Sequence, residues 1–456
     1  MIVLIAPLDW GLGHATRCIP LIRALERAGH TVVACASGAG ARLLRAEFPH
    51  LTVEDVPGHA MTYTKNRALL PLWLLAQLPL FLLGAWREGR AARRLCRRHG
   101  AGLIIADGRY GFRAPEVPAV FVTHQLGIVP PGPVWVRAAL APLLRRLNAR
   151  ALTRFAEVWV PDFDGSPNLS GALGHPAPRT HTGPGTSRGS GRPGASGLRV
   201  SYIRPLCRFR PVEAPWGSAP VPRPLAPRAE ADLPVPPRAG PPAPGAVPAA
   251  PTIDILALVS GPEPQRSLFE KALRSALAAL PGTHVLVRGV PGPAGGAGQD
   301  SGTGAGSCVV RQGTLTVFDH VSGAQLAVWL EAAGHVVCRS GYTTMMELAG
   351  VAKANVLLVP TPGQPEQEVL AVHARRMGFA AWQDQDALDV AAGLREAASL
   401  PGFGALTGGR EDGEAAGGAG GPPEVPQQAR GGGDDEGEGA FTLAAWIAAH
   451  PLLTGR

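Results

Sequence analysis

A glycine-rich turn that carries a histidine, Gly-Leu-Gly-His at residues 11–14, is the feature of the sequence that most suggests chemistry. Residues 2–6 before it form a short apolar, β-branched run, which predicts a buried parallel strand. Residues 19–28 after it have the spacing of an amphipathic helix. The glycines allow another molecule to approach the backbone closely. Such a turn places His14 at the carboxyl edge of the sheet, where its imidazole either takes a proton near neutral pH or only caps the helix.

A second turn, within Cys-Arg-Ser-Gly-Tyr-Thr-Thr-Met-Met-Glu-Leu at residues 338–348, reads as a strand end, a Ser-Gly turn and a helix start. The first N–H groups of a helix are unpaired and positive, so they suit a diphosphate. Ser340, Thr343 and Thr344 add hydroxyl donors, and Glu347 can accept hydrogen bonds from a ribose diol. The alternative is ordinary N-capping by serine or threonine.

A third turn, Ser-Gly-Pro-Glu-Pro-Gln-Arg at residues 260–266, follows another predicted strand. Gln265 and Arg266 stand at the start of the next helix, where they can hold a phosphate. A loop fixed by prolines, with Arg266 on the surface, explains the same residues without a ligand.

The loop Pro-Thr-Pro-Gly-Gln-Pro-Glu-Gln-Glu at residues 360–368 also follows a strand. Gln364, Glu366 and Gln367 offer polar groups that suit sugar hydroxyls. Acidic residues near the positive end of a capped helix are the alternative. We favour the ligand site because three such loops converge on one sheet edge.

The composition indicates two domains joined by segments of low complexity. The chain has 456 residues, enough for two α/β domains, and its 59 Gly and 46 Pro are concentrated in a few stretches. Such stretches cannot bury a core, so we expect mobile insertions or linkers there. The six cysteines show neither paired nor metal-ligand spacing, which fits a reducing compartment without a metal site or cofactor. The four stretches are residues 176–197, 211–251, 291–306 and 404–439.

Alternating strand and helix patterns predict two doubly wound α/β domains that face each other across a cleft. Asp107 and His124 each follow a strand, so they should share an edge with His14. The expected division is residues 1–175, a linker at 176–251 with a short strand at 200–210, a second domain at 252–400, an acidic Gly-rich segment at 401–440 and a helix at 441–456. Strands are expected at 2–6, 31–35, 103–106, 117–123, 157–161, 202–209, 253–259, 283–287, 335–338 and 355–359. Helices are expected at 19–28, 39–47, 69–98, 134–155, 265–280, 324–333, 343–351, 366–376 and 441–450.

The formal charge of +8 is concentrated in two arginine clusters, at residues 87–98 and 137–154. The apolar segment 69–83 directly before the first cluster is 15 residues long, about 22 Å as a helix and short of the roughly 30 Å of a bilayer core. We therefore expect residues 69–98 to contact an anionic membrane surface, with a buried helix and a true span as alternatives. No nucleic-acid module is recognisable, so nucleic acid is not an expected partner. The N-terminus lacks a basic leader, so we expect a cytoplasmic location, with peripheral contact at the inner face of the cytoplasmic membrane as a further expectation.

The combination of GLGH with RSGYTTMMEL and PTPGQPEQE resembles the GT-B glycosyltransferases of family 28. The family includes the bacterial transferase that adds N-acetylglucosamine to a lipid-linked peptidoglycan precursor. The resemblance is strongest to uncharacterised bacterial members that share a PLDWGLGHATR start and an SGPEPQR loop. It covers residues 1–175, 200–210 and 252–380. It implies that the first domain binds the acceptor and the second binds a nucleotide sugar, a UDP-sugar.

The resemblance also implies roles for single residues. His14 matches the general base, and Gly13, His124 and Gln125 lie at positions near the acceptor. The family usually has Gln where this chain has Glu366, so the transferred sugar stays open. The expected nucleotide-sugar ligands are Ser260, Arg266, Phe318, Ser340, Gly341, Thr343, Thr344, Glu347, Gln364, Glu366 and Gln367, with Phe318 near the nucleobase.

The function expected from the sequence is that of an inverting glycosyltransferase, a hexosyltransferase acting on a lipid-linked or other membrane-proximal glycan acceptor. The sugar would be a hexose or an N-acetylhexosamine. Two alternatives stay open: a nucleotide-sugar epimerase or hydrolase of the same fold, and a non-catalytic nucleotide-sugar sensor or membrane scaffold.

Overall fold

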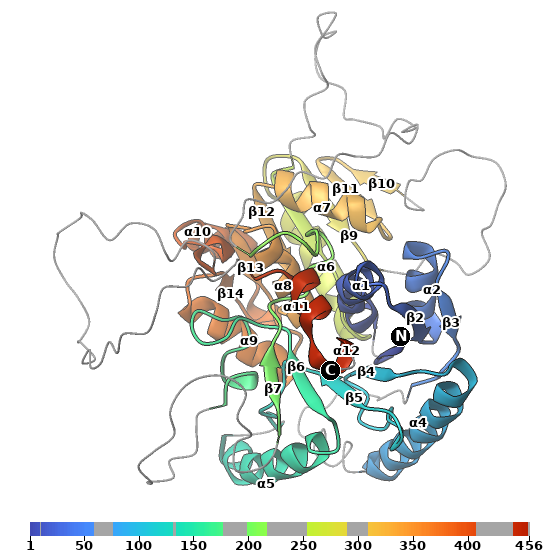
Figure 1. Cartoon of the computed structure of the whole chain (residues 1–456). Helices are drawn as coiled ribbons and strands as arrows, with labels where there is room; N and C mark the ends of the chain where they lie inside the picture. Colours follow the sequence, from blue (N-terminus) through green and yellow to red (C-terminus); the bar gives the residue numbers. More distant parts are fainter. Residues whose placement is uncertain are drawn as a thin grey trace, which may run out of the picture.

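The computed structural model shows two sheets, each covered by helices, that pack against each other through their helices and loops (Figure 1). We call them the first and second lobes. It describes residues 1–9, 11–58, 76–130, 134–176, 198–216, 253–289, 309–406 and 441–454. Most of the four stretches rich in Gly and Pro lies outside these ranges, as do residues 69–75 of the apolar segment.

The first lobe contains a seven-stranded, fully parallel sheet in the order β3-β2-β1-β4-β5-β6-β7. The central strand β1 (Ile2–Pro7) is buried on both faces, as its apolar sequence predicts. Its other strands are β2 (Thr31–Cys35), β3 (Thr52–Glu54), β4 (Leu103–Asp107), β5 (Ala119–Val122), β6 (Glu157–Val160) and β7 (Val200–Tyr202). Its helical segments are α1 (Leu12–Arg27), α2 (Gly38–Glu47), α4 (Leu78–His99), α5 (Val134–Leu152) and η2 (Gly171–Leu173).

The second lobe has the order β10-β11-β9-β8-β12-β13-β14, parallel except for the β10–β11 hairpin. Its strands are β8 (Ile255–Leu258), β9 (His284–Val287), β10 (Val309–Gln312), β11 (Leu315–Phe318), β12 (His335–Cys338), β13 (Val356–Leu358) and β14 (Ala381–Trp382). Its helical segments are α6 (Gln265–Ala278), α7 (Gly323–Ala332), α8 (Tyr342–Gly350), α9 (Pro365–Arg376), η3 (Gln385–Ala387), α10 (Val390–Ala398) and η4 (Phe403–Leu406).

The last described helices follow the second lobe in sequence but pack on the first lobe. Helices α11 (Leu443–Ala449) and α12 (Pro451–Thr454) lie beside the first sheet (Figure 1). The ring of Trp446 meets that of Trp159 on β6 edge to face, with centroids 4.9 Å apart. One apolar cluster therefore runs from α1 through the contact between the lobes to α8.

The structure corrects two expectations about the elements and adds elements that were not expected. The first helix begins at Leu12 and not at residue 19, so His14 lies in its first turn. The strand expected at 202–209 is β7, which pairs with β6 only over Val200–Tyr202. No predicted element corresponds to β3, β10, β11, β14 or α10. No helix in the described part of the chain is long and apolar enough to cross a membrane.

Candidate active site

His14 lies at the carboxyl edge of the first sheet, beside the last residue of β4. Its Nδ1 is 3.0 Å from Oδ2 of Asp107, which is completely buried. The His14 side chain is 20% exposed, and its Nε2 forms no hydrogen bond with any described residue. Gly108 is required here, because a Cβ at this position would come within 3.0 Å of Cε1 of His14 and because its φ is +73°. The ionised Asp107 favours a proton on Nδ1, whereas an N–H group of Arg17 2.8 Å away favours a lone pair there. The tautomer with the proton on Nδ1 is the one that leaves the Nε2 lone pair available.

Arg17 connects this pair to a second histidine. It lies one turn after His14 on α1, and its Nε is 2.8 Å from both oxygens of Asp107. Its terminal nitrogens lie 2.8 Å from Nδ1 of His14 and 3.4 Å from Nδ1 of His124. Burial and then Arg17 lower the pKa of His14 below 6.5, although Asp107 acts in the opposite direction. Burial acts to raise the pKa of Asp107, but Arg17 and His14 hold it at about 2.

His124, which follows β5, reaches across to the second lobe. Its Nε2 is 2.8 Å from Oε1 of Glu366 on α9, and the amide of Gln125 donates to the other oxygen of that carboxylate. The ring of Tyr342 stacks on His124, with centroids 3.9 Å apart and planes 5° apart. Burial acts to raise the pKa of Glu366, but the attraction of His124, His14 and Arg17 makes the net shift downward.

The two glycine-containing turns found in the sequence are in direct contact. Oγ1 of Thr343, in the first turn of α8, donates to the carbonyl oxygen of Gly13 at 3.1 Å. Gly341 and Thr344 beside it are half-buried. The fold thus brings together residues of both lobes at one place: Gly13, His14, His124, Gln125, Gly341, Thr343, Thr344 and Glu366.

Several other expected ligand residues bind protein groups. Ser340 is completely buried, and its Oγ donates to the carbonyl oxygen of Gln367 at 2.8 Å. The side chain of Gln367 accepts from the backbone N–H of Thr361 and donates to Gln364. The expectation that Ser340 offers its hydroxyl to a diphosphate therefore does not match its position. The backbone N–H groups at the start of α8 are the donors that remain.

Glu347, expected at the ribose, is buried and forms an ion pair with Nε of Arg208 at 2.7 Å. Burial raises its pKa against the attraction of Arg208. Phe318, expected near the nucleobase, is buried and packs on Trp329. A ligand reaches these two side chains only after the protein contacts around them change.

The loop after β8 shows a similar difference. Ser260 is exposed at the end of this strand. Arg266, expected to hold a phosphate, instead forms ion pairs with Glu263 in the preceding turn and with Glu270 on its own helix. Its guanidinium is thus occupied by carboxylates, of which Glu270 lies one helical turn further along α6.

The sequence reasoning missed Arg17, Tyr342 and Arg208 as parts of the site. Arg17 had a usable signal, because a residue three positions after His14 shares its face of a helix. Tyr342 stands inside the recognised RSGY turn. Arg208 lies in the segment between the lobes, and no local pattern marks it. No cluster of three potential metal ligands occurs among the residues that the structure describes, and the five cysteines there are free and buried.

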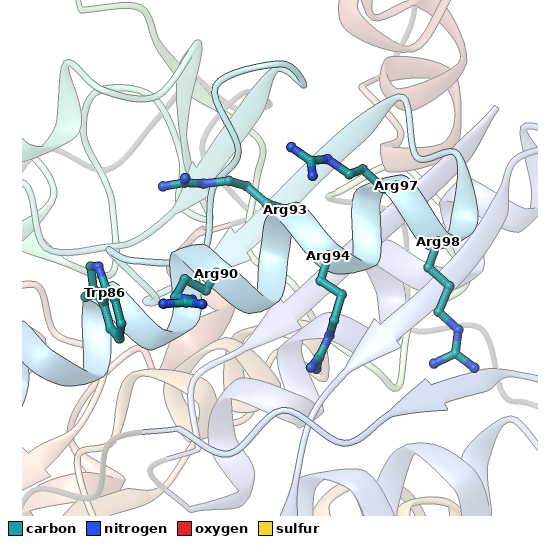
Figure 2. A pocket seen from close by; sticks show the side chains of 6 residues that line it. All are labelled: Trp86, Arg90, Arg93, Arg94, Arg97 and Arg98. Carbon is teal, nitrogen blue, oxygen red and sulfur yellow. The ribbon is translucent and has the colours of Figure 1, made fainter.

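A second candidate site is the surface of α4. Trp86 and five arginines line a hollow of about 700 Å³ along this helix. In Figure 2, Arg93 and Arg97 extend above the helix, and Arg94 and Arg98 extend below it. The guanidinium of Arg90 lies over the Trp86 ring at 4.7 Å. A neighbouring hollow of about 640 Å³ between α4 and residues 55–58 is partly apolar.

The chain is similar in structure to known glycosyltransferases. It matches the glycotransferase of kitacinnamycin with a TM-score of 0.50 and 16% identity, over 89% of this chain and 92% of that one. CalG4, the calicheamicin glycosyltransferase, matches with 0.48 and 14%, over 87% and 90%. MurG of Acinetobacter baumannii matches with 0.42 and 13%, over 89% and 94%. No protein-family model and no curated protein sequence matches the chain.

Proposed function

We infer a function for this chain from its site and from its fold, which is GT-B with two facing α/β lobes. We propose that the chain is an inverting glycosyltransferase of family 28, a hexosyltransferase that uses a UDP-sugar and a lipid-linked acceptor. The observation that carries the proposal is the contact between the lobes. It brings the His14–Asp107 pair to the first turn of α8, through Thr343 and Gly13.

The His14–Asp107 pair suits removal of a proton from an acceptor hydroxyl. Such a hydroxyl has too high a pKa to attack unaided, so a base must take its proton during the attack on the anomeric carbon. His14 takes that proton at Nε2, and Asp107 stabilises the imidazolium that forms. One displacement inverts the configuration of the anomeric carbon.

The start of α8 suits the departing diphosphate. The N–H groups of its first turn and the hydroxyl of Thr344 meet the charge that develops on the leaving group, and the hydroxyl of Thr343 joins them once its hydrogen bond to Gly13 is broken. Glu366 then serves the sugar hydroxyls, and Gln367 does so once its hydrogen bonds to Thr361 and Gln364 have changed. Glu347 serves the ribose once Arg208 has moved away from it, and domain closure excludes water.

The first test is the exchange His14→Ala. Loss of the base should abolish transfer while donor binding remains, because the donor contacts belong to the second lobe. Glu347→Ala should instead weaken donor binding. Transfer is measured by release of UDP, and binding by calorimetry. His50→Ala changes an exposed histidine away from the site and should leave both unchanged. Unchanged turnover in His14→Ala would refute the role of base.

One observation favours the epimerase or hydrolase alternative. His124 and Glu366 face each other across the two lobes at 2.8 Å, an acid–base pair that can act on a sugar without an acceptor. Such an enzyme consumes UDP-sugar in the absence of acceptor, whereas a transferase needs the acceptor. Incubation with a panel of nucleotide sugars, with and without lipid extract, separates the two. A non-catalytic sensor binds a donor and consumes none under either condition.

We further propose that α4 and α5 hold the enzyme against an anionic membrane, where the acceptor resides. Both helices lie at the bottom of the view in Figure 1 and expose leucines among arginines. Exposed apolar side chains beside cations fit the interfacial region of a bilayer. The exposed apolar residues are Leu78, Leu80, Leu82, Leu83 and Trp86 on α4 and Leu140, Leu143 and Leu147 on α5.

Vesicle sedimentation tests this surface. Wild-type protein should bind phosphatidylglycerol vesicles more strongly than phosphatidylcholine vesicles. The double exchange Leu80→Glu/Leu82→Glu should weaken binding by about tenfold or more, since it removes apolar burial and adds negative charge. Leu268→Glu, at an exposed position on α6, is the matched control. Equal binding of the double variant and the wild type would contradict the proposal.

A further inference from the structure

Arg339 is a buried arginine next to the proposed diphosphate site. It directly follows β12 and precedes the Ser340–Gly341 turn at which α8 begins. Its side chain is 1% exposed, and the guanidinium lies over the ring of Phe269 at 4.0 Å. Neither the proposed base nor the expected ligand residues include it.

The guanidinium holds three segments of the second lobe together through neutral acceptors. One terminal nitrogen donates to the carbonyl oxygens of Val359 and Pro360, both at 3.1 Å. The other donates to the carbonyl oxygen of Gln265 at 3.0 Å and to the side chain of Gln385 at 2.6 Å. These segments are the loop after β13, the start of α6 and η3. The loop after β13 and the start of α6, which follows the loop after β8, lie at the carboxyl edge of the sheet, where open α/β folds bind ligands.

The charge of Arg339 has no carboxylate partner among the described residues, and its Nε has no hydrogen-bond partner there. Two other arginines that are buried to a similar degree, Arg17 and Arg109, each lie beside a carboxylate. Burial lowers the pKa of Arg339 to about 9, so it is still a cation at neutral pH. A buried cation without an anion is costly, and an anionic ligand nearby offsets that cost.

We propose that Arg339 is a positioning residue whose unpaired charge selects a diphosphate at the start of α8. It acts through the electric field behind the turn and by holding the loops in place, and not by direct contact with the ligand. The N–H groups of the first turn of α8 provide the contacts, and the charge of Arg339 adds to their positive potential. This inference rests on the proposed donor site.

Calorimetric titration with UDP and with uridine tests the role of the charge. In Arg339→Gln the affinity for UDP should fall by about tenfold or more, while that for uridine changes less than about twofold, because uridine carries no phosphate. The dependence of UDP affinity on salt concentration should also become weaker. Arg395→Gln removes the same charge from an exposed position on α10 and should change neither affinity.

A charge-retaining variant separates the field from the shape of the loops. Arg339→Lys keeps the charge but loses the planar fork, so both ligands should bind more weakly while the ratio of their affinities stays within about threefold of the wild-type ratio. Thermal unfolding identifies any variant that does not fold. If Arg339→Gln does not fold, the ratio of UDP to uridine affinity in Arg339→Lys alone tests the proposal. Equal losses for UDP and uridine in Arg339→Gln, or a collapsed ratio in Arg339→Lys, would overturn the proposal. Failure of the wild type to bind UDP would instead overturn the proposed donor site.

Discussion

At the scale of single residues, the site depends on one cation placed among three titratable groups. Arg17 contacts Asp107, His14 and His124, so it offsets the buried carboxylate and opposes a proton on His14. Asp107 has the opposite effect on His14. The balance between these two neighbours should therefore set the pH below which His14 no longer acts as a base.

Removal of Asp107 should lower the rate of transfer, and it should move the acidic limb of the pH profile of kcat/KM to lower pH. In Asp107→Asn only burial and Arg17 act strongly on His14, and both lower its pKa. The acidic limb of the kcat/KM profile should therefore move to lower pH. The rate at its plateau should fall by about 10²–10⁴-fold, because the base is less well oriented and its imidazolium is no longer stabilised. A limb that moves to higher pH would contradict the assignment.

Removal of Arg17 should move the limb the other way. Arg17→Gln removes the cation that lowers the pKa of His14, so the limb should shift to higher pH. The same exchange leaves Asp107 buried without its main partner, which should cost about 3–5 kcal/mol in the free energy of unfolding, measured in urea. Arg17→Lys keeps the charge and should leave the limb close to that of the wild type. Limbs that shift in the same direction in Arg17→Gln and Asp107→Asn would rule out this electrostatic balance.

At the scale of elements, the apolar runs of the sequence predicted the buried strands well. Short edge strands and the start of the first helix were not predicted. Buried parallel strands are apolar on both faces, so the strand at residues 2–6 and its neighbours were recognisable, and the shared edge of His14, Asp107 and His124 is confirmed. The start of α1 was missed because its N-cap is Gly11, which offers no capping side chain. Strands β3 and β10 were missed because they are short, partly polar edge strands.

The site was predictable only where residues lie close together in the sequence. The turns at Gly13 and Thr343 were recognised one by one from their glycines and hydroxyls. The ion pair of Glu347 with Arg208 joins residues far apart in the sequence, and Arg208 belongs to a segment without a pattern. Whether a polar side chain meets a ligand or a protein partner depends on such long-range contacts.

The packing of α8 against the segment between the lobes leads to a prediction for one glycine. A Cβ on Gly350 would lie 2.2 Å from Sγ and 2.7 Å from Cβ of Cys207. Because Cβ is fixed to the backbone, a rotation of the Cys207 side chain cannot relieve this contact. Gly350→Ala should therefore lower the free energy of unfolding by about 1–3 kcal/mol. In Gly404→Ala the new Cβ meets only a carbonyl oxygen at 3.9 Å, and the stability should stay the same. Equal stability of the two variants in urea would show that the segment around Cys207 moves aside without cost and would contradict this prediction.

At the scale of the whole molecule, the lobes are in contact through polar groups as well as through the apolar cluster. The Tyr342 hydroxyl donates to the carbonyl oxygen of Pro161 at 2.8 Å. Nε2 of His373 lies 2.9 Å from the carbonyl oxygen of Asn168. With the His124–Glu366 pair, these contacts hold the lobes closed over the proposed site. If a donor sugar binds Glu366 in place of His124, as we propose, we expect turnover to require the lobes to separate and close again.

A disulfide between the lobes tests that requirement. A Cβ on Gly13 would lie 3.6 Å from Cβ of Thr343, within the range of about 3.5–4.5 Å found in disulfides. The double exchange Gly13→Cys/Thr343→Cys should therefore form a bond on oxidation. Oxidised protein should lose most of its turnover and recover it with dithiothreitol, because the bond prevents separation of the lobes at the site. Each single exchange, treated in the same way, shows the effect of the substitutions alone. If the oxidised double variant, with its bond verified by mass spectrometry, turns over at the rate of its reduced form, the lobes need not separate, and the donor must enter with Gly13 and Thr343 still in contact.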